Sequence, residues 1–209
     1  AYRARGYSSW LAVGQKRSQD PDVFVVPNQE FHGRWYHFFR GVSSRLKRVK
    51  GKLGVETTLS GLAGSLSEPG RWLDYHLGVE DFHFPGTSRL LTLPGKRPDI
   101  LHAHNLHGDY FDLRMLPWLS RQLPVIMTLH DAWLLSGHCA HSFACERWKT
   151  GCGNCPDITI YPGLKIDSTA INWQRKKEIF SQAQLYIATP CQWLMDKVND
   201  SILAPAMME

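Results

Sequence analysis

Four short apolar runs constrain the fold of this chain more than any other feature. They lie at residues 9–13 (SWLAV), 99–103 (DILHA), 125–129 (VIMTL) and 185–188 (LYIA). Each is rich in large apolar or β-branched residues with little polar alternation, which is typical of strands covered on both faces of a parallel sheet. Residues 23–26 are a weaker fifth candidate. The runs therefore predict a buried sheet of mostly parallel strands.

Helical patterns lie between several of these runs. Apolar side chains recur at steps of four and three from Trp35 to Leu53, which marks one face of a helix. Further helices are expected over residues 111–122, 172–184 and 192–202. The alternation predicts an α/β fold, in which a Rossmann-like, mostly parallel sheet carries helices on both faces.

Composition and charge narrow the class of protein. The hydrophobic content of 43% and the charged content of 21% are those of a globular domain. No apolar stretch of about 18 residues is present, and the first residues do not have the pattern of a signal peptide. The net charge of +5 favours an anionic partner, either nucleic acid, phospholipid or a sugar nucleotide. Five cysteines without a secretion signal predict a reducing, cytoplasmic location.

Polar residues follow two of the predicted strands. The run at 99–103 leads into HNLHGDY at 104–110, and the run at 125–129 leads into HDAW at 130–133. Ligands of doubly wound sheets bind beyond the carboxyl ends of the strands, so these two segments are where chemistry is expected. Gly108 would let the backbone approach a ligand closely.

The motifs from residue 98 to 194 resemble glycosyltransferase family 4, and most closely the bacterial exopolysaccharide and colanic-acid-type glycosyltransferases. The resemblance covers the chain from about Ser9 to its end. It rests on HNLHGDYFDL, PVIMTLHDAW, SGHCAHSFACERWKTGCGNCP and the segment around YIATPCQWL. The block at 130–156 is specific, whereas an isolated His-Asp pair would be a weak signal. Two positions depart from the family pattern, since Cys191 stands where serine is usual and Met127 where a larger aromatic residue is expected.

The resemblance implies a GT-B fold, in which two Rossmann-like domains face each other across a cleft. Residues 1–209 would be the N-terminal, acceptor-side domain, cut at both ends. Most of the site for the nucleotide-sugar donor would lie in a C-terminal domain. The family further implies retaining transfer of a sugar to a glycan or lipid-linked acceptor in cell-surface polysaccharide synthesis, with no metal cofactor in catalysis.

The resemblance also assigns residues to the site. His130 would stabilise charge on the sugar or leaving group, and Asp131 would either orient His130 or cap the segment that follows. Substrate-binding residues would be His104, Asn105, His107, Gly108, Tyr110 and Trp133. The alternative for these histidines, and for His102 in the preceding strand, is ordinary packing with hydrogen bonds to backbone carbonyls.

The loop at 137–156 carries cysteines in a C-x5-C-x6-C-x2-C pattern. They are Cys139, Cys145, Cys152 and Cys155. Four thiolates can complete a tetrahedral site for structural zinc, with no position left open for catalysis. His138 and His141 are reserve ligands, and the alternatives are two disulfides or four free thiols.

A basic amphipathic helix is expected at residues 29–52. Its cationic residues are Arg40, Arg45, Lys47, Arg48, Lys50 and Lys52. Such a helix can lie on an anionic membrane surface, which would place the protein peripherally on the inner face of the plasma membrane. The alternative is a helix whose apolar stripe faces the core while its basic face is solvated.

Two other functions compete with the transferase. A zinc-binding nucleic-acid module would need basic and aromatic residues interleaved around the cysteines, but that loop holds only Arg147 and Lys149 as cations. The transferase interpretation therefore expects no nucleic-acid partner. A catalytically inactive scaffolding domain is the other alternative.

Overall fold

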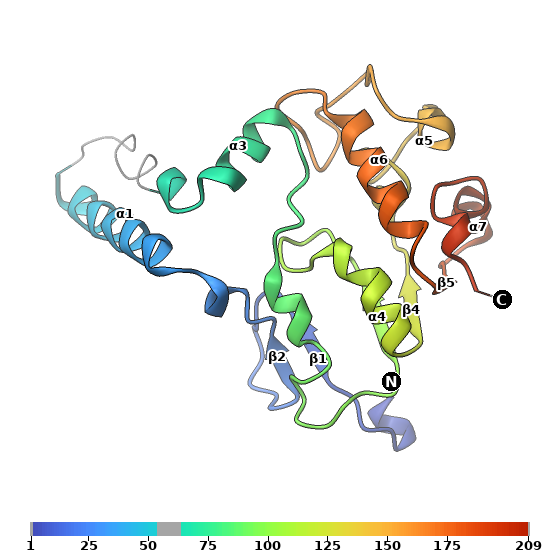
Figure 1. The fold of residues 1–209 in the computed structure, drawn as a ribbon, viewed down its shortest axis with the longest axis horizontal. Helices are drawn as coiled ribbons and strands as arrows, with labels where there is room; N and C mark the ends of the chain where they lie inside the picture. The colour runs from blue at the N-terminus through green and yellow to red at the C-terminus, as the bar shows by residue number, and fades with distance from the viewer. Residues whose placement is uncertain (1, 54–63, 209) are drawn as a thin grey trace.

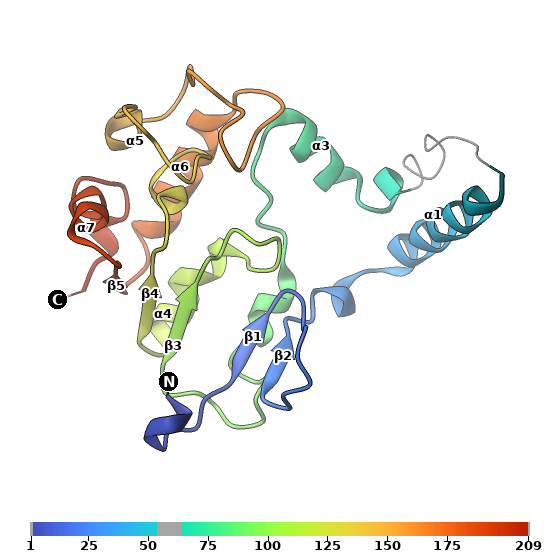
Figure 2. The same ribbon diagram turned by 180° about the vertical axis from the view of Figure 1, so that it is seen from behind.

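The computed structural model describes residues 2–53 and 64–208, with side chains for residues 2–45 and 64–208. Its strands form two parallel sheets, which confirms the predicted α/β class. β1 (Leu11–Val13) pairs with β2 (Val23–Val25). β4 (Val125–Thr128) lies between β3 (Leu101–His104) and β5 (Leu185–Ala188) in the larger sheet. Figure 2 shows β1 and β2 continuing the layer on the β3 side.

Helices α4 (Leu116–Gln122) and α6 (Thr169–Phe180) cover one face of the larger sheet (Figure 1). Val125 and Met127 point into this layer and are almost fully buried. They pack with Leu116 and Leu119 of α4 and Phe180 of α6 in one hydrophobic core. Burying large apolar side chains of this kind is the main stabilising contribution, at about 1.5–3 kcal/mol for each one.

The opposite face of the sheet carries polar side chains. Because His102 is in register with Ile126 and His104 with Thr128, these four side chains share that face. Helices were predicted on both faces of the sheet. On the face that holds Val125 and Met127, the covering helices are α4 and α6. On the second face, Tyr2 contacts His102, next to the 3-10 segment η1 (Arg3–Arg5).

Helices α1 (Arg34–Leu53) and α3 (Pro69–Leu77) extend away from the sheets in Figures 1 and 2. We call them together the arm. The expected helix at 29–52 begins later, because residues Asn28–Phe31 form the 3-10 segment η2. α3 was not expected from the sequence.

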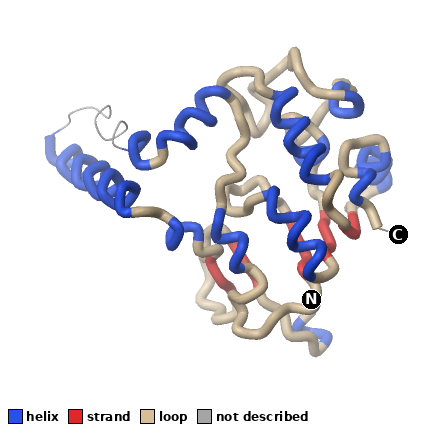
Figure 3. Tube along the Cα trace, viewed as in Figure 1, coloured by secondary structure: helices blue, strands red, loops and turns tan. Residues whose placement is uncertain are grey.

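Much of the chain between β4 and α6 is loop (Figure 3). It contains only the 3-10 segment η5 (Trp133–Leu135) and the short helix α5 (Arg147–Thr150). Helix α7 (Gln192–Asn199) follows β5 and buries Leu194 and Val198. The remaining 3-10 segments are η3 (Pro85–Arg89), η4 (Leu113–Met115) and η6 (Ala204–Ala206). The loop between β4 and α6 therefore holds both the HDAW segment and the cysteines.

Candidate functional site

The carboxyl ends of β3 and β4 bring the two predicted polar segments together. Parallel pairing places His104 beside Thr128, so the residues that follow each strand emerge at one edge. A shallow pocket at this edge is lined by His107 from one segment and by His130 and Asp131 from the other. His107 and His130 therefore lie at one edge of the sheet, at the strand ends where the sequence predicts chemistry.

His104 and His130 contact each other through their rings. The distance from His104 Nδ1 to His130 Nε2 is 3.0 Å, and both side chains are exposed. One of these nitrogens must carry a proton and donate, and the other must accept without one. Because a protonated histidine carries N–H on both nitrogens, the accepting ring must be in its neutral form. Burial, followed by the charges of His102 and His130, lowers the pKa of His104. The lowered pKa favours the neutral form of His104, and the tautomers of the two rings decide which nitrogen donates. In either case the contact uses Nε2 of His130 and leaves Nδ1 of that ring for a ligand.

Asp131 holds His107 rather than His130. Its Oδ2 lies 2.9 Å from His107 Nε2, and its Oδ1 accepts a hydrogen bond from the Trp133 backbone N–H at 2.9 Å. The carboxylate therefore closes a local turn at the start of η5 and orients the His107 ring. Two roles were considered for Asp131. Its hydrogen bond to the Trp133 N–H accords with support of the following segment, whereas His130, the ring that it was expected to orient, contacts His104.

The turn after β3 needs unusual backbone angles. Asn105 and Asp109 adopt φ values of 44° and 53°, in the left-handed region that Asn and Asp tolerate better than most residues. The Tyr110 hydroxyl donates to the carbonyls of His104 and Asn105 at 3.2 and 3.4 Å, and burial raises its pKa. Tyr110 thus supports the turn from behind, and its hydroxyl is engaged with protein carbonyls.

Gly108 and Trp133, both predicted to bind substrate, pack against other residues of the site. A Cβ on Gly108 would lie 3.2 Å from the Tyr110 ring, so its absence lets the turn close over that ring. Trp133 is 5% exposed, with its ring centroid 5.4 Å from that of His107. Trp133 lines the pocket although little of it is exposed, and a contact of its indole with substrate stays a prediction.

His102 has partners that no sequence pattern signals. Its Nε2 lies 2.8 Å from Thr128 Oγ1, and its Nδ1 lies 2.7 Å from the hydroxyl of Tyr2. Burial, and then the charge of His130, lowers the pKa of His102. Its ring centroid is 4.2 Å from that of His104, so it packs beneath the exposed histidine pair. Tyr2 is a hundred positions away in sequence, and only the three-dimensional structure reveals the contact.

The four predicted cysteines line one cavity together with His138. All four are free thiols, so the disulfide alternative is not observed. Cys155 Sγ lies 3.5 Å from His138 Nε2, and Cys152 Sγ accepts the Gly137 N–H at 3.3 Å. Burial is the main cause that raises the pKa of Cys152 to about 11, so this thiol is neutral without a cation. Within the described residues, however, no three His, Cys, Asp or Glu side chains are arranged to hold a metal ion.

His138 is also tied to the surrounding loop. It is almost fully buried, and its Nδ1 lies 3.0 Å from the Pro162 carbonyl. The other reserve ligand, His141, is exposed, and its Nδ1 accepts the Phe143 N–H at 3.0 Å. Of the two histidines, only His138 lines the cavity of the four cysteines.

The arm exposes aromatic side chains. Trp35 and Phe38 of α1 are 61% and 64% exposed, and Trp72 and Tyr75 of α3 are 46% and 58% exposed. The alternative of a core-facing stripe on α1 is therefore wrong for Trp35. Four of the expected cations have side chains that the structure does not describe, namely Lys47, Arg48, Lys50 and Lys52. None of the described helices is both long and apolar enough to span a membrane.

A parallel α/β layer with polar side chains gathered at the carboxyl ends of its strands is typical of Rossmann-like ligand-binding domains. Over 104 residues the chain is 33% identical to the protein named "Putative colanic acid biosynthesis glycosyl transferase WcaC" from Escherichia coli (strain K12). This match covers 46% of the chain and only 25% of that relative's length. The similarity relates the chain to a glycosyltransferase. No protein-family model matches the chain, and no solved structure matches it significantly.

Proposed function

We propose that the chain is the acceptor-side domain of a retaining glycosyltransferase of the GT-B type, within family 4. It would transfer a hexosyl unit from a nucleotide-sugar to a glycan or lipid-linked acceptor during cell-surface polysaccharide synthesis. The similarity to WcaC and the motifs at 104–110 and 130–156 support this proposal. A second Rossmann-like domain would complete the cleft and supply most of the donor site.

The convergence of two histidine-bearing segments at one sheet edge carries the proposal. His130 is exposed there, and His104 holds one of its ring nitrogens. In the tautomer in which Nε2 of His130 accepts from His104, Nδ1–H of His130 can donate a hydrogen bond to an oxygen on which charge develops as the bond between the donor sugar and its leaving group breaks. The proposed role of His130 is therefore electrostatic stabilisation, which requires no metal cofactor.

His107 and Asp131 fit the binding of the acceptor. The carboxylate of Asp131 fixes the ring of His107 at the wall of the pocket. A ring held in place can form a directional hydrogen bond to a sugar hydroxyl at little further entropic cost. Asn105, with its side chain exposed at the same pocket, would add a donor and an acceptor for a second hydroxyl.

The cations of the cysteine loop argue against a nucleic-acid module. Arg147 donates to the Asn154 carbonyl, and Lys149 lies within ion-pair distance of Glu146 and Asp200. These partners neutralise or occupy the two cations that would have to meet phosphates. The geometry therefore favours a transferase without a nucleic-acid partner.

We propose in addition that the arm rests on an anionic membrane surface, which would place the site beside lipid-linked acceptors on the inner face of the membrane. The sequence of α1 has seven arginine or lysine residues and no acidic residue, and α1 and α3 expose the four aromatic side chains described above. Exposed aromatic rings beside clustered cations are typical of segments that bind the interface of anionic bilayers.

Transfer by the full-length enzyme tests the proposed function. Purified protein is incubated with individual nucleotide-sugars and with glycan or lipid-linked acceptors, and the product is identified by mass spectrometry. We expect transfer from at least one donor, with kcat lowered by at least ~10²-fold in His130→Ala, the scale for losing one charge-stabilising contact.

His83→Ala is the matched control, because His83 is exposed on a segment outside the pocket. It should leave the rate unchanged. Transfer that persists at the normal rate in His130→Ala would assign His130 a structural role. A complete absence of transfer with every donor would favour the inactive scaffold instead.

A further inference from the structure

Lys176 of α6 is a fully buried lysine whose charge is matched by its surroundings. Its Nζ donates to Glu80 Oε1 at 2.9 Å, to the Trp133 carbonyl at 2.9 Å and to the Ser136 carbonyl at 3.0 Å. An ammonium has three N–H donors, so these three acceptors satisfy it completely. Nζ also lies 3.9 Å from the centroid of the Trp133 ring, a favourable position for a cation.

The ion pair with Glu80 compensates for the burial of both groups. Desolvation is the largest effect on each of them, and it lowers the pKa of Lys176 and raises the pKa of Glu80. The charge of the partner acts in the opposite direction on each group. A buried charge is retained only where such partners exist, so this arrangement depends on all of its members.

The two carbonyls that Lys176 binds belong to the turn after Asp131. Trp133 accepts from Lys176 through its carbonyl and donates through its N–H to Asp131 Oδ1. The second oxygen of Asp131 contacts His107 Nε2. A continuous series of hydrogen bonds therefore runs from the buried ammonium to the His107 ring at the pocket.

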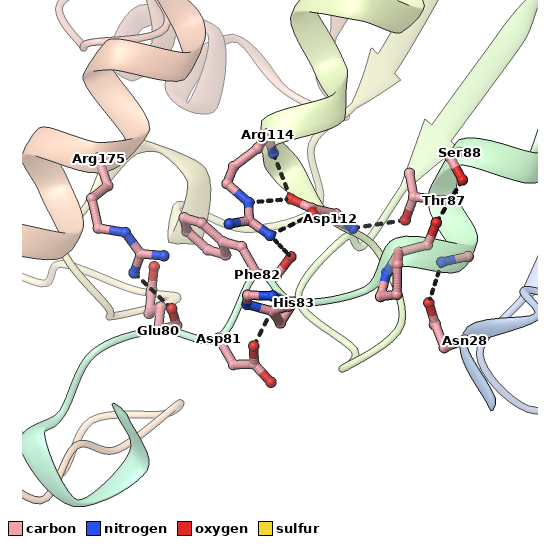
Figure 4. Close-up of polar contacts among 12 residues, drawn as sticks. Asn28, Glu80, Asp81, Phe82, His83, Thr87, Ser88, Asp112, Arg114 and Arg175 are labelled. Carbon is pink, nitrogen blue, oxygen red and sulfur yellow. Dashed lines mark hydrogen bonds and ion pairs between the residues drawn. The ribbon is translucent and has the colours of Figure 1, made fainter. Parts of the chain in front are cut away.

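The same helix holds the end of the arm. Asn172 accepts the Glu80 N–H through its side-chain oxygen and donates to the Gly78 carbonyl, each at 2.9 Å. Arg175 donates to the Glu80 carbonyl at 2.7 Å (Figure 4). Figure 4 also shows Arg114 reaching the Phe82 carbonyl, at 3.3 Å. The main chain at residues 78–82 is thus fixed, so Glu80 presents its carboxylate to Lys176 from a rigid position.

We propose that Lys176 is a positioning residue for the candidate site. Its ammonium fixes the turn from Asp131 to Ser136 against α6, and the turn in turn sets the place of Asp131 and the orientation of the His107 ring. This inference rests on the proposed function where it concerns acceptor binding. Its structural part, the placement of His107, does not.

The test compares charge-removing variants of the full-length protein. Lys176→Met removes the ammonium but leaves Glu80 buried without its cation, so it can fail to fold. The double variant Glu80→Gln/Lys176→Met removes both charges and keeps the core neutral. Lys177→Met is the matched control, because Lys177 is the next residue of α6 and is exposed. Phe180→Leu, in the core on the same helix, controls for a general loss of stability.

Two readouts separate positioning from stability. The first is the NMR signal of the His107 ring in histidine-labelled protein. We expect this signal to move in the double variant and to stay in place in Lys177→Met and in Phe180→Leu, even where the melting temperature of Phe180→Leu falls. The second is kcat/KM for the acceptor, which should fall on the order of 10²-fold, the scale for a misplacement of about 1 Å, while KM for the donor stays unchanged.

A folded double variant with an unmoved His107 signal would overturn the proposal. The same result in Lys176→Met, where that variant folds, would also overturn it. If the enzyme transfers no sugar at all, the proposed function fails but the His107 signal still decides whether Lys176 positions the ring.

Discussion

At the scale of single residues, the structure shows which partner each histidine of the site has, whereas the sequence places these histidines only in the same region. His104 faces His130 across the strands, whereas His107 is paired with Asp131. The sequence places all of them at strand ends, because each follows an apolar run. It does not specify the pairs, because these depend on the register between β3 and β4 and on the left-handed turn at Asn105. Lys176 was missed for a similar reason, since its partners Glu80 and Trp133 are distant in sequence.

The histidines on the polar face of the sheet predict a measurable pH dependence. The folded protein lowers the pKa of His102 and His104, in both cases mainly by burial. Their neutral forms therefore contribute stability that is complete above the ordinary histidine pKa of about 6.5 and is lost as the pH falls below it toward the folded values. NMR titration should give both rings pKa values below that of an unfolded reference peptide.

His130→Gln tests the cause of these shifts. Removing the His130 charge should raise the pKa of His102 and of His104, because that charge lowers both. Values that stay constant or fall in the variant would show that the His130 charge does not contribute to the two shifts.

At the scale of elements, the strands were predicted within about two residues, while the helices were less well bounded. The helix expected at 111–122 begins as α4 at Leu116, because the Asp112 side chain caps a 3-10 turn first. α3 was missed, although its signals were present. Pro69 stands at its first turn and Gly78 closes it in the left-handed conformation, which is the usual asymmetry of helix ends. The apolar residues of α3 are exposed in the structure. The helix therefore has no core-facing apolar stripe of the kind by which the other helices were predicted.

Structural zinc in the cysteine cavity stays a prediction. The four thiols line one cavity, but among the described residues no three ligand side chains are arranged to hold an ion, whereas a zinc site needs the sulfurs about 2.3 Å from the metal. Elemental analysis of full-length protein, purified without chelators, should find close to one zinc ion per chain. Cys152→Ser should lower that content and the melting temperature, and should weaken acceptor binding because the cavity follows the HDAW segment.

Cys191→Ser provides the matched control for the zinc measurement. Cys191 is exposed and does not line the cavity. The zinc content of the Cys191→Ser variant should therefore equal that of the unmodified protein. Unmodified protein without zinc would contradict the zinc prediction and leave the cavity lined by free thiols, of which burial raises the pKa of Cys152 to about 11.

The arm predicts binding to anionic vesicles. Full-length protein should sediment with phosphatidylglycerol vesicles and not with phosphatidylcholine vesicles, and salt should weaken the binding. Arg40→Glu/Arg45→Glu should reduce the affinity by roughly 30-fold or more, at about 1 kcal/mol for each basic residue near the surface. Both arginines lie on α1 within the described side chains.

A control with the same charge change distinguishes the arm from net charge. Arg121→Glu/Lys177→Glu reverses two exposed cations on α4 and α6, the helices that cover the sheet. It should bind vesicles nearly as well as the unmodified protein. Equal losses in the two double variants would indicate non-specific attraction by the overall charge of +5.

At the scale of the whole molecule, one edge of the sheet gathers what the proposed transferase needs on the acceptor side. The polar segments meet there, α6 fixes the turn beneath them, and the cysteine cavity lies in the same loop. The described residues of that edge supply histidines, a carboxylate and an amide, which suit sugar hydroxyls better than a diphosphate. This chemistry supports the proposal that this domain binds the acceptor while a second domain binds most of the nucleotide-sugar donor.

The last prediction is that residues 1–209 alone transfer no sugar and bind nucleotide-sugars weakly, because most donor contacts would come from the second domain. The isolated chain and the full-length enzyme are compared in the same transfer assay, after circular dichroism has shown that the isolated chain is folded. Calorimetric titration should detect acceptor binding by the folded chain, weakened by His107→Ala because that ring lies at the pocket wall. Turnover by the isolated chain would mean that its own strand ends hold the donor as well, and the two-domain cleft would then be unnecessary for catalysis.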